Sequence, residues 1–192
     1  MIDYFDKVKQ AINTIDYDVV ERVIQKLMRI ENHCPMLFFG NGGSAAIANH
    51  AVADFTKGIY EDNPQFTCPA ISFCTNSPLM TAISNDIHHH EVFDRQLKYL
   101  NLPKADVVAI SSSGKSMNVV YGLGTAKEMG YYTVALVGFD GGYILENNIA
   151  DDIIHVKSDN YGVIEDCHMM ILHCIAQEIR KRTSDNPNNL KL

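Results

Sequence analysis

Five short apolar runs, separated by stretches of helical periodicity, dominate the chain from residue 36 onward. The runs cover residues 36–39, 70–74, 106–110, 133–137 and 152–156. They are β-branched and continuously apolar, which is typical of parallel strands that are buried on both faces. The helical stretches cover residues 45–57, 78–84 continuing into 91–100, 117–129 and 163–181. Repeated strand-then-helix units predict a doubly wound α/β sandwich that binds its ligands at the carboxyl ends of the strands.

Residues 1–33 precede this pattern and are helical in period. Their apolar residues recur in two groups, which are Phe5, Val8 and Ile12, then Val19, Val23, Leu27 and Ile30. We expect two N-terminal helices, the second capped by Asp16 or Asp18. Residues 1–192 are predicted to form a single domain, with an α/β core over 34–182 and a flexible polar tail over 183–192. A helix pair outside the core often packs against a second subunit, so we expect an oligomer.

Charge and composition exclude several classes of function. The net charge of -7 argues against broad binding to nucleic acid or to an anionic membrane, because both require a basic field. No apolar stretch approaches the length of a membrane span, and the first residues lack the pattern of a signal peptide. The five cysteines form no C-x-x-C pair, and we expect reduced, mostly buried thiols in a cytoplasmic protein.

Two turns made of small residues follow the first and third apolar runs. They are residues 40–44 (GNGGS) and residues 111–116 (SSSGKS). A strand, a tight polar turn and a helix together place backbone N–H groups and hydroxyls at the positive end of a helix dipole, which suits a phosphate. Neither spacing is that of a nucleotide or dinucleotide loop, so we expect a small phosphorylated ligand. The candidate hydroxyls are those of Ser44, Ser111, Ser113 and Ser116, of which Ser44 and Ser116 are also suited to capping helices.

Histidines and carboxylates recur at helical spacing on two of the predicted helices. His50 and Asp54 are four residues apart, and Glu165, His168 and His173 lie on the last helix. A histidine and a carboxylate on one helix face can chelate a divalent metal or hold an acid and a base together. The alternative is a solvated helix face with a local hydrogen bond, and spacing alone leaves both interpretations open.

Three other segments are weaker candidates. Asp86 ends a helical segment and is suited to accept a hydrogen bond from a sugar hydroxyl. Residues 88–90 are three consecutive histidines, which point in different directions on a helix, so we expect mainly a surface tract with one ring near the site. Residues 138–142 (GFDGG) are predicted to form a loop, because they are turn residues.

Taken in order, these segments resemble a known family. The chain resembles the sugar isomerase (SIS) domain superfamily and, within it, the sedoheptulose-7-phosphate isomerases, also called phosphoheptose isomerases. The resemblance covers nearly the whole chain, and the matching segments are the helical N-terminus, residues 40–44 with His50 following, residues 84–86, 110–116 and 138–142, and a final helix carrying His173.

The resemblance implies a five-stranded parallel sheet in a flavodoxin-like three-layer sandwich, a homotetramer, and sites built between subunits. It implies that the substrate is bound by Asn41, Gly42, Gly43, Ser44, Asp86, Ser111, Ser112, Ser113, Ser116 and Glu165. It places the catalytic pair on Asp54 and His173, and the zinc ligands on His50, Asp54, Glu165 and His173. The implied reaction interconverts sedoheptulose 7-phosphate and D-glycero-D-manno-heptose 7-phosphate through an enediol, for heptose in lipopolysaccharide, capsule or S-layer.

Three residues depart from the family pattern. The family's glutamate is Asp54 here, its metal-site glutamine is Glu165, and a substrate-contacting aspartate is replaced by Gly162. The shorter side chain at position 54 reduces the reach of a positioned base. These departures leave other functions open: an isomerase of a shorter sugar phosphate, a non-catalytic relative that binds the replication initiator DnaA, or a sugar-phosphate-sensing regulatory domain. The histidines and carboxylates that the chain retains favour the enzyme.

Overall fold

A parallel five-stranded sheet forms the centre of the computed structural model, which describes residues 2–28, 34–62 and 64–184. The strands are β1 (Met36–Gly40), β2 (Ala70–Ser72), β3 (Asp106–Ser111), β4 (Tyr132–Val137) and β5 (Asp152–His155). Their order across the sheet is β2-β1-β3-β4-β5, and all four pairings are parallel. This is the flavodoxin-like order, in which the strand sequence reverses between β1 and β3. The predicted fold class is therefore confirmed.

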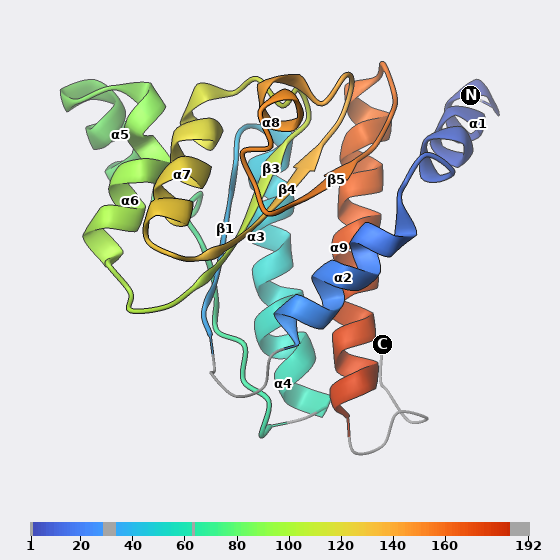
Figure 1. Ribbon diagram of the computed structural model, residues 1–192, viewed down its shortest axis with the longest axis horizontal. Helices are drawn as coiled ribbons and strands as arrows, with labels where there is room; N and C mark the ends of the chain where they lie inside the picture. The colour runs from blue at the N-terminus through green and yellow to red at the C-terminus, as the bar shows by residue number, and fades with distance from the viewer. Residues whose placement is uncertain (1, 29–33, 63, 185–192) are drawn as a thin grey trace.

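Helices cover both faces of the sheet (Figure 1). They are α1 (Ile2–Ile12), α2 (Tyr17–Leu27), α3 (Gly43–Ala53), the π-helical turn η2 (Asp54–Gly58), α4 (Ile59–Asp62), α5 (Ser77–Asp86), the 3-10 turn η3 (His89–Glu91), α6 (Val92–Leu100), α7 (Met117–Glu128), α8 (Gly142–Glu146) and α9 (Tyr161–Thr183). Each predicted helix is present. The loop predicted for residues 138–142 ends instead in the start of α8, which the sequence pattern missed.

The continuous apolar strands divide their side chains between two cores, as strands buried on both faces must. Phe38 of β1 joins the core beneath α3, α9 and α2, which also contains Phe55 and Ile171. Its neighbours Leu37 and Phe39 join the other core, beneath α6, α7 and α8. The three layers place α3 and α9 side by side on one face of the sheet, with their first turns at the carboxyl ends of the strands (Figure 1).

The N-terminal helices pack against α9. Asp16 caps α2 by accepting hydrogen bonds from the backbone N–H groups of Asp18 and Val19, which decides between the two predicted caps. Arg182 binds Glu21 through two hydrogen bonds of 2.6 and 2.8 Å and thereby lowers the pKa of that carboxyl to about 2. Residue 30 and residues 185–192 of the predicted tail lie outside the described residues, and α9 extends to residue 183.

Two expectations from composition can be compared with the structure. The five cysteines are free thiols, but only Cys68 and Cys167 are buried, and Cys174 is exposed, so the prediction of mostly buried thiols was wrong. Among the described residues, no helix is both long and apolar enough to cross a membrane.

Candidate active site

The two small-residue turns come together in one cavity at the carboxyl ends of β1 and β3. Their strands are neighbours in the sheet, with Gly40 in register with Ile110. The cavity has a volume of about 130 Å³ and is called the serine cavity here; it is lined by Asn41, Ser44, Ile110, Ser111, Ser112, Ser113, Ser116, Tyr161 and Glu165. The two turns therefore meet in the structure, and the helices α3 and α7 both begin at this place.

Glycine is required where the first turn leaves the sheet. A Cβ at position 40 would lie 2.7 Å from the carbonyl oxygen of Ile110 and 2.8 Å from the Cβ of Ser44. Gly42 has a φ of 54° and occupies the N-cap position of α3, so Ser44 is not the cap. Ser116 is the N-cap residue of α7 but makes no capping hydrogen bond with its side chain. The capping alternative therefore does not account for either hydroxyl.

Two buried hydroxyls in the serine cavity lack a hydrogen-bond partner within the described part of the chain. The Oγ atoms of Ser111 and Ser112 are in this position, and the two residues are only 4% and 6% exposed. Leaving such a group unpaired costs about 1–3 kcal/mol. Ser113 accepts a hydrogen bond of 3.2 Å from the backbone N–H of Lys115. These hydroxyls can donate to an anion, which fits the predicted phosphate site.

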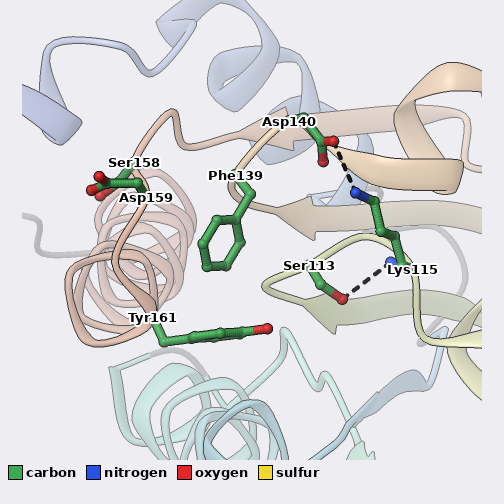
Figure 2. Close-up of a pocket in the computed structure, with 7 residues that line it drawn as sticks. All are labelled: Ser113, Lys115, Phe139, Asp140, Ser158, Asp159 and Tyr161. Carbon is green, nitrogen blue, oxygen red and sulfur yellow. Dashed lines mark hydrogen bonds and ion pairs between the residues drawn. The ribbon is translucent and has the colours of Figure 1, made fainter.

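Among the described residues, no positively charged side chain lines the serine cavity. Lys115 follows the serine turn, but its Nζ forms an ion pair of 2.9 Å with Asp140 (Figure 2). This pair borders a larger, open pocket of about 670 Å³ that also contains Phe139 and the exposed ring of Tyr161. The serine cavity consequently attracts an anion only through neutral donors and the N-termini of α3 and α7.

A network of amide groups connects the serine cavity to the histidine tract. The side chains of Asn41 and Asn118 exchange two hydrogen bonds of 2.9 and 2.8 Å. The second N–H of the Asn118 amide lies 3.3 Å from Nε2 of His89, so that nitrogen must accept. His89 is therefore the ring of the tract that is linked to the serine cavity, through Asn118 and Asn41. Asn118 was not a sequence candidate, because a buried asparagine in the first turn of a helix carries no motif.

The second predicted constellation forms further along α3 and α9. His50 lies in the last turn of α3, Asp54 begins η2, and His173 lies on α9. The Nε2 atoms of the two histidines are 3.0 Å apart, and each lies 3.4 Å from Oδ2 of Asp54. These three residues are called the imidazole cluster here. The π-helical turn at Asp54 is of a kind that is frequent at functional sites.

The donor atoms of the imidazole cluster fit a divalent metal. All three lie within 4.8 Å of one another. Oδ2 of Asp54 is buried and has no hydrogen-bond partner within the described residues. Two imidazoles and one carboxylate are the ligands that catalytic zinc sites use, with a further position left for water or substrate. The side chains of His50 and His173 are 49% and 39% exposed, so a ligand can reach them from solvent.

Glu165 does not join the imidazole cluster. Its carboxylate lies over Gly43, where a Cβ at position 43 would overlap it, and it lines the serine cavity. The residue expected as the fourth zinc ligand therefore lines the serine cavity in this structure. Asp86 is the exposed last residue of α5, where it accepts a hydrogen bond of 2.8 Å from Asn85, and it does not line the serine cavity.

His168 lies on the side of α9 that faces the sheet. Its Nε2 donates a hydrogen bond of 3.2 Å to the carbonyl of Val137, and the residue is fully buried. Burial lowers the pKa of His168 to about 4, because the charged ring would lose its solvation. His168 is therefore a neutral structural residue that joins α9 to β4, and only His173 of the two histidines reaches the site.

Comparison with known proteins places this geometry in a family. A family model described as "SIS domain" matches residues 3–138. The chain belongs to the SIS domain family. It is 35% identical over 178 residues to the probable phosphoheptose isomerase of Thermoplasma volcanium, a match that covers 92% of this chain and 89% of the relative. It is 38% identical over 180 residues to the phosphoheptose isomerase of Halorhodospira halophila, covering 93% and 90%.

Solved structures agree with the sequence matches. The phosphoheptose isomerase GmhA from Neisseria gonorrhoeae superposes on this SIS domain with a TM-score of 0.81 at 28% identity, covering 93% of each chain. The resemblance inferred from the sequence motifs is thereby confirmed at the level of family and fold.

Proposed function

We propose that this SIS domain is an aldose–ketose isomerase that converts sedoheptulose 7-phosphate to D-glycero-D-manno-heptose 7-phosphate. One observation carries the proposal: α3 and α9 each contribute residues both to the serine cavity, near their first turns, and to the imidazole cluster, further along each helix. From Glu165 to His173 is about 12 Å along the helix, at 1.5 Å per residue. This length is comparable with an open-chain heptose phosphate, so one molecule can contact both ends.

The serine cavity binds the phosphate in this proposal. Ser44, Ser111, Ser113 and Ser116 donate hydrogen bonds to the phosphate oxygens, with Asn41 and Ser112 beside them. The backbone at Gly42 and Gly43 contributes N–H groups from the first turn of α3. Because the phosphate is remote from the reacting carbons, its binding energy holds the open-chain sugar in place for reaction at the other end.

The imidazole cluster moves the protons. Isomerisation transfers a proton between C1 and C2 through an enediol, which requires a base for the carbon-bound proton and an acid for the neighbouring oxygens. We assign Asp54 and His173 as this pair, with the order of their roles open. His50, Asp54 and His173 would hold a zinc ion, which when bound supplies positive charge that stabilises the enediolate oxygens. Asp86 is assigned to a more distant sugar hydroxyl.

The proposal also covers the oligomeric state, the cellular location and the pathway of the enzyme. Phe5 and Tyr17 of the N-terminal helices are 61% and 62% exposed, which supports packing of these helices on other subunits in a homotetramer. We further propose a cytoplasmic enzyme that supplies heptose for lipopolysaccharide, capsule or S-layer. The imidazole cluster argues against a non-catalytic DnaA-binding role, because a binding protein has no need of an acid–base pair.

The test is incubation of the purified protein with sedoheptulose 7-phosphate, with zinc or with chelator, followed by NMR of the products. We expect the aldose product, and less of it after chelation. Turnover of only pentose or hexose phosphates would correct the substrate. Absence of turnover on every sugar phosphate would overturn the enzymatic proposal in favour of the binding protein.

A further inference from the structure

Tyr161 lies where the serine cavity meets the larger open pocket beside it. Tyr161 and Ser113 line both the serine cavity and the pocket that contains Phe139 and Asp140. Tyr161 is 59% exposed, and its hydroxyl has no hydrogen-bond partner in residues 2–28, 34–62 and 64–184. In Figure 2 the ring extends from the start of α9 towards Ser113, with the hydroxyl at its far end. A phenol that is available to a ligand therefore borders the cavity that is proposed to bind a phosphate.

The start of α9 fixes the backbone of Tyr161. Asn160 is the N-cap residue, and its side-chain oxygen accepts a hydrogen bond of 3.1 Å from the backbone N–H of Val163. Tyr161 is thus the first residue of the helix, four residues before Glu165, which also lines the serine cavity. Residues four apart lie on the same face of a helix, so α9 directs both side chains to the cavity.

Phe139 supports the ring of Tyr161. The two ring centroids are 4.6 Å apart and the rings are inclined at 67°, which is the edge-to-face arrangement that aromatic pairs favour. Phe139 has a φ of 48°, in the left-handed region that bulky side chains rarely adopt. Nε2 of His155 donates a hydrogen bond of 2.9 Å to the carbonyl of Phe139 and helps to hold this strained conformation. Strain of this kind concentrates at ligand sites.

The loop that carries Phe139 is joined to the serine turn. The backbone N–H of Gly138 donates a hydrogen bond of 2.8 Å to the carbonyl of Ser112. The carbonyl of Gly141 lies so close to Gly114 that a Cβ at position 114 would overlap it. The aromatic support and the hydroxyls of the serine cavity are therefore connected through the backbone, and such preorganisation reduces the cost of ordering the site when a ligand binds.

We propose that Tyr161 is a substrate-binding residue whose hydroxyl donates a hydrogen bond to the phosphate in the serine cavity. The inference rests on the phosphate binding proposed above. Among the described residues that line the cavity, α9 contributes Tyr161 and Glu165, and a carboxylate accepts hydrogen bonds but does not donate them. The phenol is therefore the donor on the α9 side, opposite the serines of the two turns. Phe139 is a positioning residue that acts through the ring of Tyr161.

The test is calorimetry at fixed pH and ionic strength, with chelator present. The two probes are inorganic phosphate and a hexitol 6-phosphate, which has no carbonyl group and is not turned over. Tyr161→Phe removes the hydroxyl and keeps the ring against Phe139. We expect the dissociation constants of both probes to rise about tenfold, because both present a phosphate to the phenol. KM for the sugar phosphate should rise by a similar factor, with little change in kcat.

Two further variants complete the test. Tyr143→Phe is the matched control, because Tyr143 of α8 is 44% exposed and does not line the serine cavity, and it should keep the wild-type constants. Phe139→Leu is made in the wild type and in Tyr161→Phe. We expect a loss of affinity of a few-fold in the wild-type background and almost none in the Tyr161→Phe background, because Phe139 acts through the Tyr161 hydroxyl.

Each outcome decides between the proposals. Unchanged affinity of Tyr161→Phe for both probes, with measurable binding by the wild type, would overturn the inference and leave the proposed phosphate site intact. Weaker binding of the hexitol phosphate alone would also overturn it, because the phenol would then contact the carbon chain. Equal losses from Phe139→Leu in both backgrounds would remove Phe139 as the positioning residue. Failure of the wild type to bind either probe would contradict the proposed phosphate site itself.

Discussion

The serine cavity and the imidazole cluster differ in how the fold builds them. The serine cavity consists of backbone turns at the carboxyl ends of β1 and β3, and its hydroxyls at Ser111 and Ser112 are buried. The imidazole cluster consists of side chains on helix faces, and its Asp54 side chain is 31% exposed. The turns of the serine cavity are fixed by the sheet and hold neutral hydrogen-bond donors in place. The helix faces of the imidazole cluster instead expose ionisable groups to a bound metal or ligand.

The difference indicates a division of work between anchoring and chemistry. Neutral buried donors bind an anion without a change of protonation, and they do so equally in the ground state and the transition state. In the proposed function, the imidazole and carboxylate groups change protonation and act on the reacting carbons. The helices α3 and α9 connect the two regions. We therefore expect variants in the imidazole cluster to change kcat and variants in the serine cavity to change KM.

The largest effect is expected at the imidazole cluster. Asp54→Asn removes the basic oxygen and weakens the metal site, so kcat should fall by about 10²–10⁴-fold. Steady-state kinetics with sedoheptulose 7-phosphate measures the loss, and calorimetry with a hexitol 6-phosphate checks that the phosphate end still binds. Glu61→Gln, an exposed carboxylate further along the same helical stretch, serves as the matched control. Wild-type kcat in Asp54→Asn would remove this residue from the chemistry.

A second prediction concerns His168, the buried histidine that lies on α9 between Glu165 of the serine cavity and His173 of the imidazole cluster. The pKa of His168 is about 4 in the folded protein against 6.5 in the unfolded chain. Between these values the unfolded state binds the proton and the folded state does not, so the free energy of unfolding falls as pH drops from 6.5 towards 4. The shift corresponds to a loss of about 3 kcal/mol.

Urea unfolding at several pH values measures this loss. His168→Leu should be slightly less stable at neutral pH, because the carbonyl of Val137 loses one of its two donors and keeps the backbone N–H of Val156. Its stability should depend less on pH in this window. His88→Asn, a change in an exposed histidine, should keep the wild-type slope. An unchanged slope in His168→Leu would show that other groups cause the acid sensitivity.

The third prediction is a change in KM at the serine cavity. Ser111→Ala removes a buried hydroxyl that has no partner among the described residues, so the folded protein should lose little stability. A hydrogen bond to a charged phosphate is worth about 1.5–3 kcal/mol, so KM should rise by about 10- to 100-fold with little change in kcat. Ser77→Ala, at an exposed serine at the start of α5, is the control. An equal fall in kcat would mean that the hydroxyl acts in the transition state as well.

The sheet and the position of the serine turns could be predicted from the sequence, because apolar runs mark the strands and the turns follow them directly. Continuous apolar runs indicated buried parallel strands, which placed the turns after β1 and β3 at the same edge of the sheet. That these two strands are neighbours comes from the structure. The start of α8 was missed because Gly141 and Gly142, with φ of 81° and 54°, are turn residues in any local pattern. The helix forms through a tertiary contact, in which the backbone N–H of Ile144 donates to the carbonyl of Gly114.

The imidazole cluster was only partly predictable from helical spacing. Spacing placed His50 with Asp54, but it could not say which of His168 and His173 faced the site, because α9 is buried along much of its length. Nor could it place the Glu165 carboxylate, whose position depends on the space that Gly43 leaves on a different helix. Contacts between helices distant in sequence decide such cases, and no local pattern encodes them.

The smallest effect is expected where the histidine tract meets the serine cavity. His89→Ala removes one acceptor from Asn118 but leaves the two hydrogen bonds between Asn118 and Asn41. His89 is exposed, so the freed N–H of the amide can bond to water, and KM should rise by a few-fold at most. Asn118→Ala breaks the whole network and leaves Asn41 unpaired, so its KM should rise several times more. A larger effect in His89→Ala than in Asn118→Ala would mean that His89 contacts the substrate directly, which would extend the chemistry of the imidazole cluster to the other side of the serine cavity.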